Sequence, residues 1–120
     1  GRDQLAIVAQ DMIRESPIVG HGFGAYNILG PGQACYPHNI FLEITSETGL
    51  VGCALFVALL ASVLVCVRKQ FKSPSGIDMF ALMGAIIQLV GAQFSGDLYD
   101  SRMMLFFFAM LAIPMVRKES

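Results

Sequence analysis

The chain has 120 residues, of which 55% are hydrophobic and only 14% charged, and its mean hydropathy is +0.63. This composition is too apolar for an ordinary soluble domain of this size and predicts an integral membrane protein. No basic cluster is interleaved with aromatic residues, so nucleic-acid binding has no support, and three cysteines without a C-x-x-C pair suggest neither a disulfide framework nor a zinc site.

Residues 2–15 are predicted to form an amphipathic helix. Apolar side chains recur at helical spacing, at Leu5, Val8, Ala9 and Met12. The polar residues between them make the helix too polar to span a bilayer, so we expect it to lie on the membrane surface or against other helices. Pro17 ends it, because the residue before a proline avoids helical backbone angles.

A glycine-rich segment follows, from residue 20 to residue 32. Gly20, Gly22 and Ala25 formally fit the G-x-G-x-x-A dinucleotide fingerprint, but that motif requires a preceding strand and a following helix. Here an amphipathic helix precedes the glycines and a Gly/Pro loop is expected to follow. We therefore expect an irregular loop in which glycines take positive φ angles and fold the backbone compactly near a ligand or the membrane.

The remaining chain predicts three transmembrane helices, at about 39–67, 77–95 and 98–116. Asn39 is a good N-cap for the first, which we expect to kink near Gly49 and Gly52. Residues 50–67 contain no charge and, at about 1.5 Å per residue, cross most of a roughly 30 Å hydrocarbon core. The fold class predicted is therefore all-α and integral to the membrane, with residues 1–38 as a periplasmic loop segment and 39–120 as the membrane part.

The orientation of these helices follows from their basic residues. The turn 68–76 carries three lysines and arginines and the tail carries Arg117 and Lys118, whereas the turn 96–102 carries only Arg102. The positive-inside rule places the first turn and the tail in the cytoplasm. The His38 region and the turn 96–102 then share the opposite side.

That outer side gathers most of the polar side chains that could do chemistry. They are His38, Asn39, Glu43, Asp97, Asp100 and Arg102, with Arg2 and His21 nearby. Histidine can act as a base near neutral pH, and arginine suits phosphate oxygens, so an anionic substrate and a proton transfer are the natural combination. Each residue has a structural alternative, since interfacial charges also anchor helix ends and Asp100 can pair with Arg102.

Three motifs occur together in the first half of the chain. They are Gly1-Arg2, the loop Ser16-Pro17-x-x-Gly20-x-Gly22-x-Gly24, and His38-Asn39-x-x-Leu42 followed by Gly49-Leu50-x-Gly52. In combination they resemble the O-antigen ligase and polymerase family of bacterial envelope enzymes. The resemblance covers residues 1 to 52, and the turn 96–102 is similar to a weaker family element.

The resemblance implies an inverting, metal-independent glycosyl transfer without a cofactor, at the periplasmic face of the bacterial inner membrane. The donor would be a glycan on undecaprenyl diphosphate, and the acceptor a sugar hydroxyl of lipid A-core or of another glycan. Family proteins have more spans, so we expect this chain to be a C-terminal part. A further family arginine should lie upstream, and the piece alone should not be active.

The same resemblance assigns roles to individual residues. His38 matches the family histidine proposed to deprotonate or orient the acceptor hydroxyl, and Arg2 matches an arginine thought to hold the donor diphosphate. Asn39 and Arg102 are weaker matches for diphosphate binding. Glu43, which the resemblance does not assign, is our second candidate for the catalytic base.

Other readings of the sequence stay open. Ligase, polymerase and protein-glycosylating ligase are not separated by these motifs. A transporter or flippase fragment would use Gln88, Gln93 and Asp97 to line a path, although glutamines within spans also form hydrogen bonds between helices. A purely structural membrane module would use the outer polar residues only to anchor helix ends.

Overall fold

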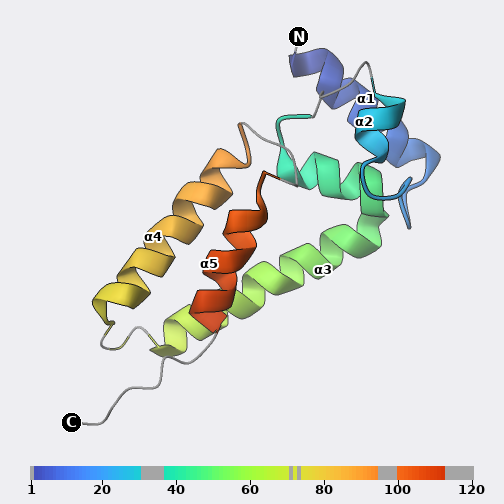
Figure 1. Ribbon diagram of the computed structural model, residues 1–120. Coiled ribbons are helices and arrows are strands. Elements are labelled where there is room, and N and C mark those ends of the chain that lie inside the picture. Colours follow the sequence, from blue (N-terminus) through green and yellow to red (C-terminus); the bar gives the residue numbers. More distant parts are fainter. Residues whose placement is uncertain (1, 31–36, 71, 73, 95–99, 113–120) are drawn as a thin grey trace.

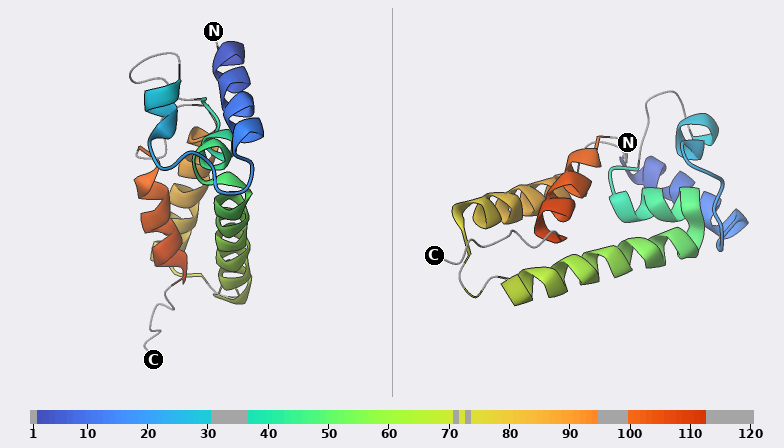
Figure 2. Two further views of the ribbon diagram at one scale, coloured as in Figure 1. Left: turned by 90° about the vertical axis from the view of Figure 1, so that its right-hand side faces the viewer. Right: turned by 60° about the horizontal axis from the view of Figure 1, so that its bottom comes forward.

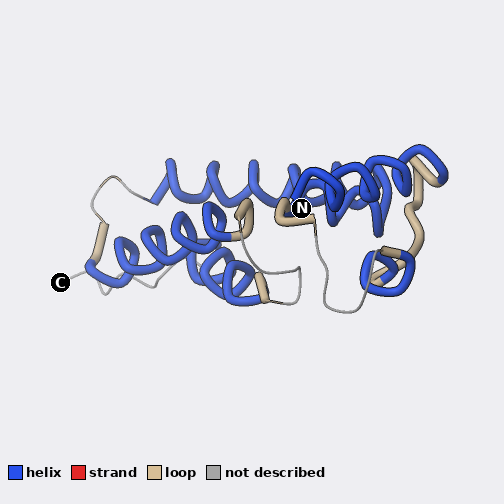
Figure 3. Tube along the Cα trace, turned by 90° about the horizontal axis from the view of Figure 1, so that it is seen from above, coloured by secondary structure: helices blue, strands red, loops and turns tan. Residues whose placement is uncertain are grey.

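The computed structural model describes residues 2–30, 37–70, 72, 74–94 and 100–112, with Arg2 and Gln70 described by their backbone alone (Figure 1). Every regular element in those ranges is a helix, which confirms the predicted all-α class. The helices are α1 (Arg2–Glu15), α2 (Ala25–Leu29), α3 (Ile40–Gln70), α4 (Gly76–Gly91) and α5 (Arg102–Ala112). The tube in Figure 3 shows the same helices from above.

The first helix has the predicted bounds and the predicted amphipathic character. Ala9 and Met12 are buried and form a small core with Ala25 and Tyr26 of α2. The polar side of α1 faces outward, where Arg14 pairs with Asp11 at 3.1 Å. Helix α1 packs on α3, so it lies against another helix, which is one of the two placements expected for it.

Helix α3 is one element with a sharp break. Asn39 caps it as predicted, because its Oδ1 accepts hydrogen bonds from two backbone N–H groups of the first turn, Phe41 at 3.0 Å and Leu42 at 3.1 Å. Gly49 then has φ 67° and ψ −168°, so the predicted kink lies at this glycine. Figures 1 and 2 show the short first segment, 40–48, turning there into the long second segment.

The second segment, residues 50–70, is the long and mainly apolar part of α3. At about 1.5 Å per residue it is about 30 Å long, which matches the hydrocarbon core of a bilayer. Most of its large apolar side chains, such as Leu55 and Leu64, are exposed in this chain. Among the described residues, α3 is the helix that is both long and apolar enough to cross a membrane.

Helices α4 and α5 form an apolar pair beside α3. Helix α4 packs closely on α5, where Gly84 leaves room for the Phe107 ring, and α5 packs on α3. The two helices have 16 and 11 residues, shorter than the spans predicted at 77–95 and 98–116. Residues 95–99 and 113–116 lie outside the described ranges, so the second and third spans remain predictions.

The helix ends are arranged in two groups. The start of α3, the end of α4 and the start of α5 lie at one end of the bundle, and the turn from α3 to α4 lies at the other (Figure 1). A backbone hydrogen bond of 3.2 Å from Ile40 N to Ala92 O joins the first two directly. The start of α3 and the start of α5 therefore lie at the same end, as expected, while residues 95–99 of the turn between α4 and α5 lie outside the described residues.

Candidate active site

The break in α3 is closed by backbone from elsewhere in the chain. In an unbroken helix the N–H groups of Leu50 and Val51 would donate to the carbonyls of Ser46 and Glu47. The left-handed angles of Gly49 turn these groups away from one another. Buried backbone groups need partners, so a break of this kind requires another segment to supply them.

The loop 16–24 supplies those partners in pairs. Four backbone hydrogen bonds join the loop to the break, Leu50 N to Pro17 O at 2.8 Å, Val51 N to Ile18 O at 3.2 Å, His21 N to Ser46 O at 3.3 Å and Gly22 N to Glu47 O at 2.8 Å. Two loop carbonyls thus accept from the start of the long segment, and two loop N–H groups donate to the end of the short one. We call this arrangement the backbone clamp.

Two motif glycines make the clamp possible. Gly20 has φ 68°, and a Cβ there would collide with the Glu47 carbonyl. Gly49 has φ 67°, and a Cβ there would collide with the Ile18 carbonyl. The prediction that glycines of the loop take positive φ angles in a compact loop is confirmed at Gly20, Gly22 and Gly24. The sequence did not indicate that the S-P-x-x-G loop and the G-L-x-G segment bind each other.

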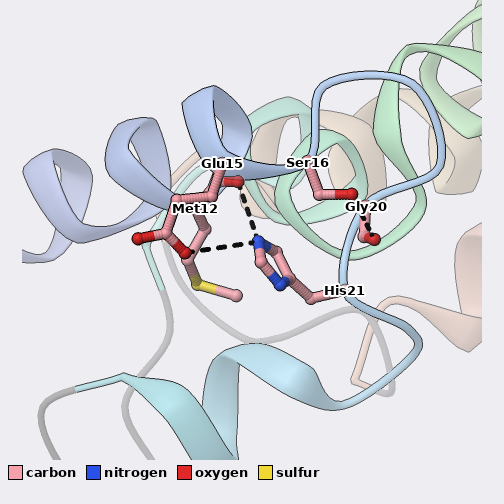
Figure 4. A network of polar contacts seen from close by, with 5 residues as sticks. All are labelled: Met12, Glu15, Ser16, Gly20 and His21. Carbon is pink, nitrogen blue, oxygen red and sulfur yellow. Dashed lines mark hydrogen bonds and ion pairs between the residues drawn. The ribbon is translucent and has the colours of Figure 1, made fainter.

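His21 joins the same loop to the end of α1. Its Nε2 donates to the Met12 carbonyl at 2.9 Å and lies 3.9 Å from a Glu15 carboxylate oxygen (Figure 4). Beside it, the Ser16 hydroxyl donates to the Gly20 carbonyl at 2.8 Å. Through these contacts the His21 side chain holds the loop against the end of α1.

A short helix that the sequence analysis missed lies between the loop and α3. We expected an irregular segment, but α2 forms over residues 25–29 and is held by Glu47, whose Oε1 accepts from the Tyr26 N–H at 3.2 Å. Tyr26 is buried, and its hydroxyl donates to the Leu5 carbonyl at 2.7 Å. Glu47 itself is buried, with only 2% of its surface exposed.

His38 occupies an unusual backbone conformation just before α3. Its φ of 52° is positive, which is uncommon for any residue other than glycine. Its Nδ1 lies 3.2 Å from the carbonyl oxygen of Phe94, beyond the end of α4. A carbonyl oxygen can only accept, so Nδ1 carries the proton of this hydrogen bond, and in the neutral form of the ring the lone pair is then on Nε2. That is the tautomer that a base acting through Nε2 requires.

Asn39 and Glu43 follow His38 on α3 but are differently placed. The Oδ1 of Asn39 is occupied by the helix cap, so only its Nδ2 group is chemically suited to donate to a phosphate. The Glu43 side chain is 5% exposed, on the same short segment. A base must come within hydrogen-bond reach of the hydroxyl that it deprotonates, and half-buried His38 meets that requirement more easily than Glu43.

The two arginines of the predicted site come from other helices. Arg102 is exposed at the start of α5, at the same end of the bundle as the start of α3. Arg2 is the first residue of α1, and Figure 1 shows the N-terminal end of α1 above the start of α3, but its side chain lies outside the described residues. Asp97 also lies outside them. The fold thus brings His38, Asn39 and the start of α5 to one end of the molecule.

Of the two glutamines assigned to a transport path, Gln93 has a described contact. Its Nε2 donates at 3.4 Å to the carbonyl of Leu89, four residues earlier and inside the last turn of α4. The Gln93 side chain thus has a hydrogen-bond partner in its own segment of the chain. A polar transport path is not needed to explain its presence.

The first half of the chain matches a known family. The family model described as O-Antigen ligase matches residues 1–57, a stretch that includes α1, the loop, α2, the break in α3 and all the motifs on which the resemblance was based. No curated protein and no solved structure matches the chain. The family is membrane-embedded, in agreement with the apolar second segment of α3. The match over residues 1–57 confirms the resemblance read from the motifs: this part of the chain is similar to the O-antigen ligase family.

Proposed function

We propose that this chain carries the acceptor-activating part of a glycosyltransferase in the inner membrane of a bacterium. The enzyme transfers a glycan from undecaprenyl diphosphate to a sugar hydroxyl of lipid A-core, at the periplasmic face. The family match supports a ligase-type or polymerase-type activity, and the observation that carries the proposal within this chain is His38, with Nδ1 held by the Phe94 carbonyl.

His38 acts as the general base in this proposal. The acceptor oxygen attacks the anomeric carbon of the donor sugar while its proton moves to His38 Nε2. The bond between that carbon and the diphosphate oxygen breaks, and undecaprenyl diphosphate leaves with the electron pair. A single displacement of this kind inverts the configuration at the anomeric carbon. The hydrogen bond to Phe94 keeps the ring in the tautomer and orientation that the step needs.

Cationic side chains stabilise the leaving group. Charge develops on the diphosphate as the glycosidic bond breaks, and guanidinium groups bind phosphate oxygens with two parallel hydrogen bonds. We assign this role to Arg2 and Arg102, with the Nδ2 group of Asn39 as a weaker contributor. Neither the base nor the arginines need a metal ion for this step, since the arginines supply the positive charge. Glu43 is the second candidate for the base.

The test compares three versions of the full-length protein in a strain that lacks its own ligase. These are the wild type, His38→Ala and His38→Asn, each assayed for long-chain lipopolysaccharide at the cell surface. Asparagine tolerates positive φ and can donate its side-chain N–H to the Phe94 carbonyl, but it cannot act as a base at neutral pH. We expect both variants to be expressed at the wild-type level and to lose the long-chain product by about 10²-fold or more.

Each alternative gives a different result. If His38→Asn transfers glycan as well as the wild type, His38 only positions the start of α3 and the assigned base is wrong. If the wild type restores no lipopolysaccharide but lengthens lipid-linked glycans, the acceptor is another glycan and the enzyme is a polymerase. A transporter would instead leave the lipid-linked donor on the cytoplasmic face when inactivated.

A further inference from the structure

The backbone clamp carries an apolar surface that neither the core nor the candidate site uses. It consists of five large apolar side chains, Ile18, Val19 and Phe23 of the loop and Leu50 and Val51 of α3, and we call it the apolar rim. All five are exposed in this chain, with Phe23 at 79%, Val19 at 69% and Leu50 at 58%.

The hydrogen bonds of the clamp fix the depth of the rim. Leu50 and Val51 are the first residues of the apolar segment of α3, a helix long and apolar enough to cross a membrane. Their N–H groups are bonded to Pro17 and Ile18, so the loop lies beside the first turn of that segment. The loop cannot lie deeper without breaking the clamp, and it cannot lie higher without unpairing two backbone N–H groups.

The surfaces on either side of the rim have opposite character. Below it, the apolar surface continues along α3 through exposed side chains such as Leu55. Above it, α1 exposes Asp11, Arg14 and Glu15. A boundary between a charged surface and an apolar surface, at the head of a membrane helix, is where the lipid headgroups meet the acyl chains.

We propose that the apolar rim inserts into the outer part of the lipid bilayer and that the loop 17–23 is an interfacial membrane anchor. Four of its backbone polar groups are paired with α3 by the clamp, which lowers the cost of placing them at the edge of a membrane. The anchor fixes α1 and the first segment of α3 at the height of the membrane surface. Phospholipid covers the apolar rim in this proposal, because the rim continues the exposed apolar surface of α3.

Spin labelling of the full-length protein tests the anchor. Nitroxide labels would be placed at Val19→Cys, with Asp11→Cys and Leu55→Cys as matched controls, in a variant whose native cysteines are serine. The protein would be reconstituted in vesicles of phosphatidylethanolamine and phosphatidylglycerol. Collisions with oxygen, which concentrates in the bilayer, would be compared with collisions with a water-soluble nickel complex.

We expect the oxygen-to-nickel collision ratio at position 19 to be severalfold higher than at position 11 and lower than at position 55. A nickel-dominated signal at position 19 would place the loop in water and overturn the proposal. Low collision rates with both reagents would show that protein covers the rim, either another segment of the chain or a second copy, and would overturn it equally.

A second measurement guards against a label that disturbs the loop. Phe23→Trp should gain fluorescence that is quenched by phospholipids brominated near the headgroup more strongly than by phospholipids brominated near the chain end. Equal and negligible quenching by both would contradict a shallow insertion. Neither measurement depends on glycosyl transfer, so both remain informative if the proposed enzyme activity is wrong.

Discussion

Backbone angles decide the structural roles of several single residues in this chain. Gly20 and Gly49 have positive φ and also face a backbone carbonyl where a side chain would begin, so two independent constraints select glycine at each position. His38 has a positive φ as well, although it is not a glycine. Strain of this kind persists where surrounding contacts hold it, and here the contacts are the Asn39 cap and the bond to Phe94.

Replacing a clamp glycine should destabilise the protein. We expect Gly49→Ala and Gly20→Ala each to cost about 1–3 kcal/mol from backbone strain alone, and more from the collision with the facing carbonyl. The measurement is the thermal unfolding of the full-length protein in detergent. Gly91→Ala is the matched control, because a Cβ there meets nothing within 4 Å. If the melting temperature of Gly91→Ala falls as far as the melting temperatures of Gly20→Ala and Gly49→Ala, the loss of stability does not come from the clamp.

Asn39 allows helix capping to be separated from substrate binding. Asn39→Asp keeps a side-chain oxygen for the Phe41 and Leu42 N–H groups, so the melting temperature should change little. It removes the Nδ2 donor and adds a negative charge where a diphosphate is proposed to bind, so the KM for the lipid-linked donor should rise. Asn39→Ala should instead lose about 1 kcal/mol of stability. An unchanged KM in Asn39→Asp would remove this residue from the diphosphate site.

At the level of helices, the break at Gly49 divides α3 into two segments with different surroundings. The first segment is capped by Asn39 and carries buried Glu43 and Glu47, whereas the second segment is mainly apolar and most of its large side chains are exposed. A continuous helix would have placed these carboxylates in line with the span. The break turns the first segment aside, and α1 and α2 then bury its polar face.

The contact between α4 and α5 depends on a small residue facing a large one. A Cβ on Gly84 would lie 2.5 Å from the Phe107 ring, so Gly84→Ala should loosen the pair. Small residues allow this close approach between helices in a membrane. We expect Gly84→Ala to lower the melting temperature and Phe107→Leu to relieve much of that loss, as measured by a double-mutant cycle. Met83→Ala on the exposed face is the control. Simple additivity of the Gly84 and Phe107 changes would contradict the assigned contact.

Across the whole molecule, the fold places the start of α3 and the start of α5 at one end and the basic turn at the other. The helices alternate in direction, so residues far apart in the sequence meet at a common end. Basic residues gather at the opposite end, where Arg68, Lys69 and Lys72 are exposed. If this end lies in the cytoplasm, as the positive-inside rule predicts, the start of α3 faces the periplasm.

Labelling from the two sides of the membrane tests that orientation. A membrane-impermeant thiol reagent should modify Asp100→Cys in intact spheroplasts, where it reaches only the outer face of the inner membrane. It should modify Lys72→Cys only after the spheroplasts are lysed. The physical reason is that lysine and arginine near helix ends are retained in the cytoplasm. Modification of position 72 in intact spheroplasts would invert the topology and remove the proposed site from the periplasmic face.

The sequence by itself determined the features that depend on local pattern. Helical spacing and Pro17 set the bounds of α1, Asn39 marked the start of α3, and Gly49 marked its break. The motifs also indicated a resemblance to the O-antigen ligase family, which the match over residues 1–57 confirms. These features could be read directly because caps, breaks and periodicity are properties of neighbouring residues.

The tertiary structure alone decided which segments bond to each other. The pairing of the 16–24 loop with the break at Gly49 joins residues about 30 positions apart in sequence, and no local pattern encodes such a partner. Helix α2 was missed because five residues give almost no periodic signal, and its stability comes from buried Tyr26 and from Glu47. Glu47 shows the reason most clearly, since a carboxylate appears exposed in a sequence until another segment supplies the N–H group that allows its burial.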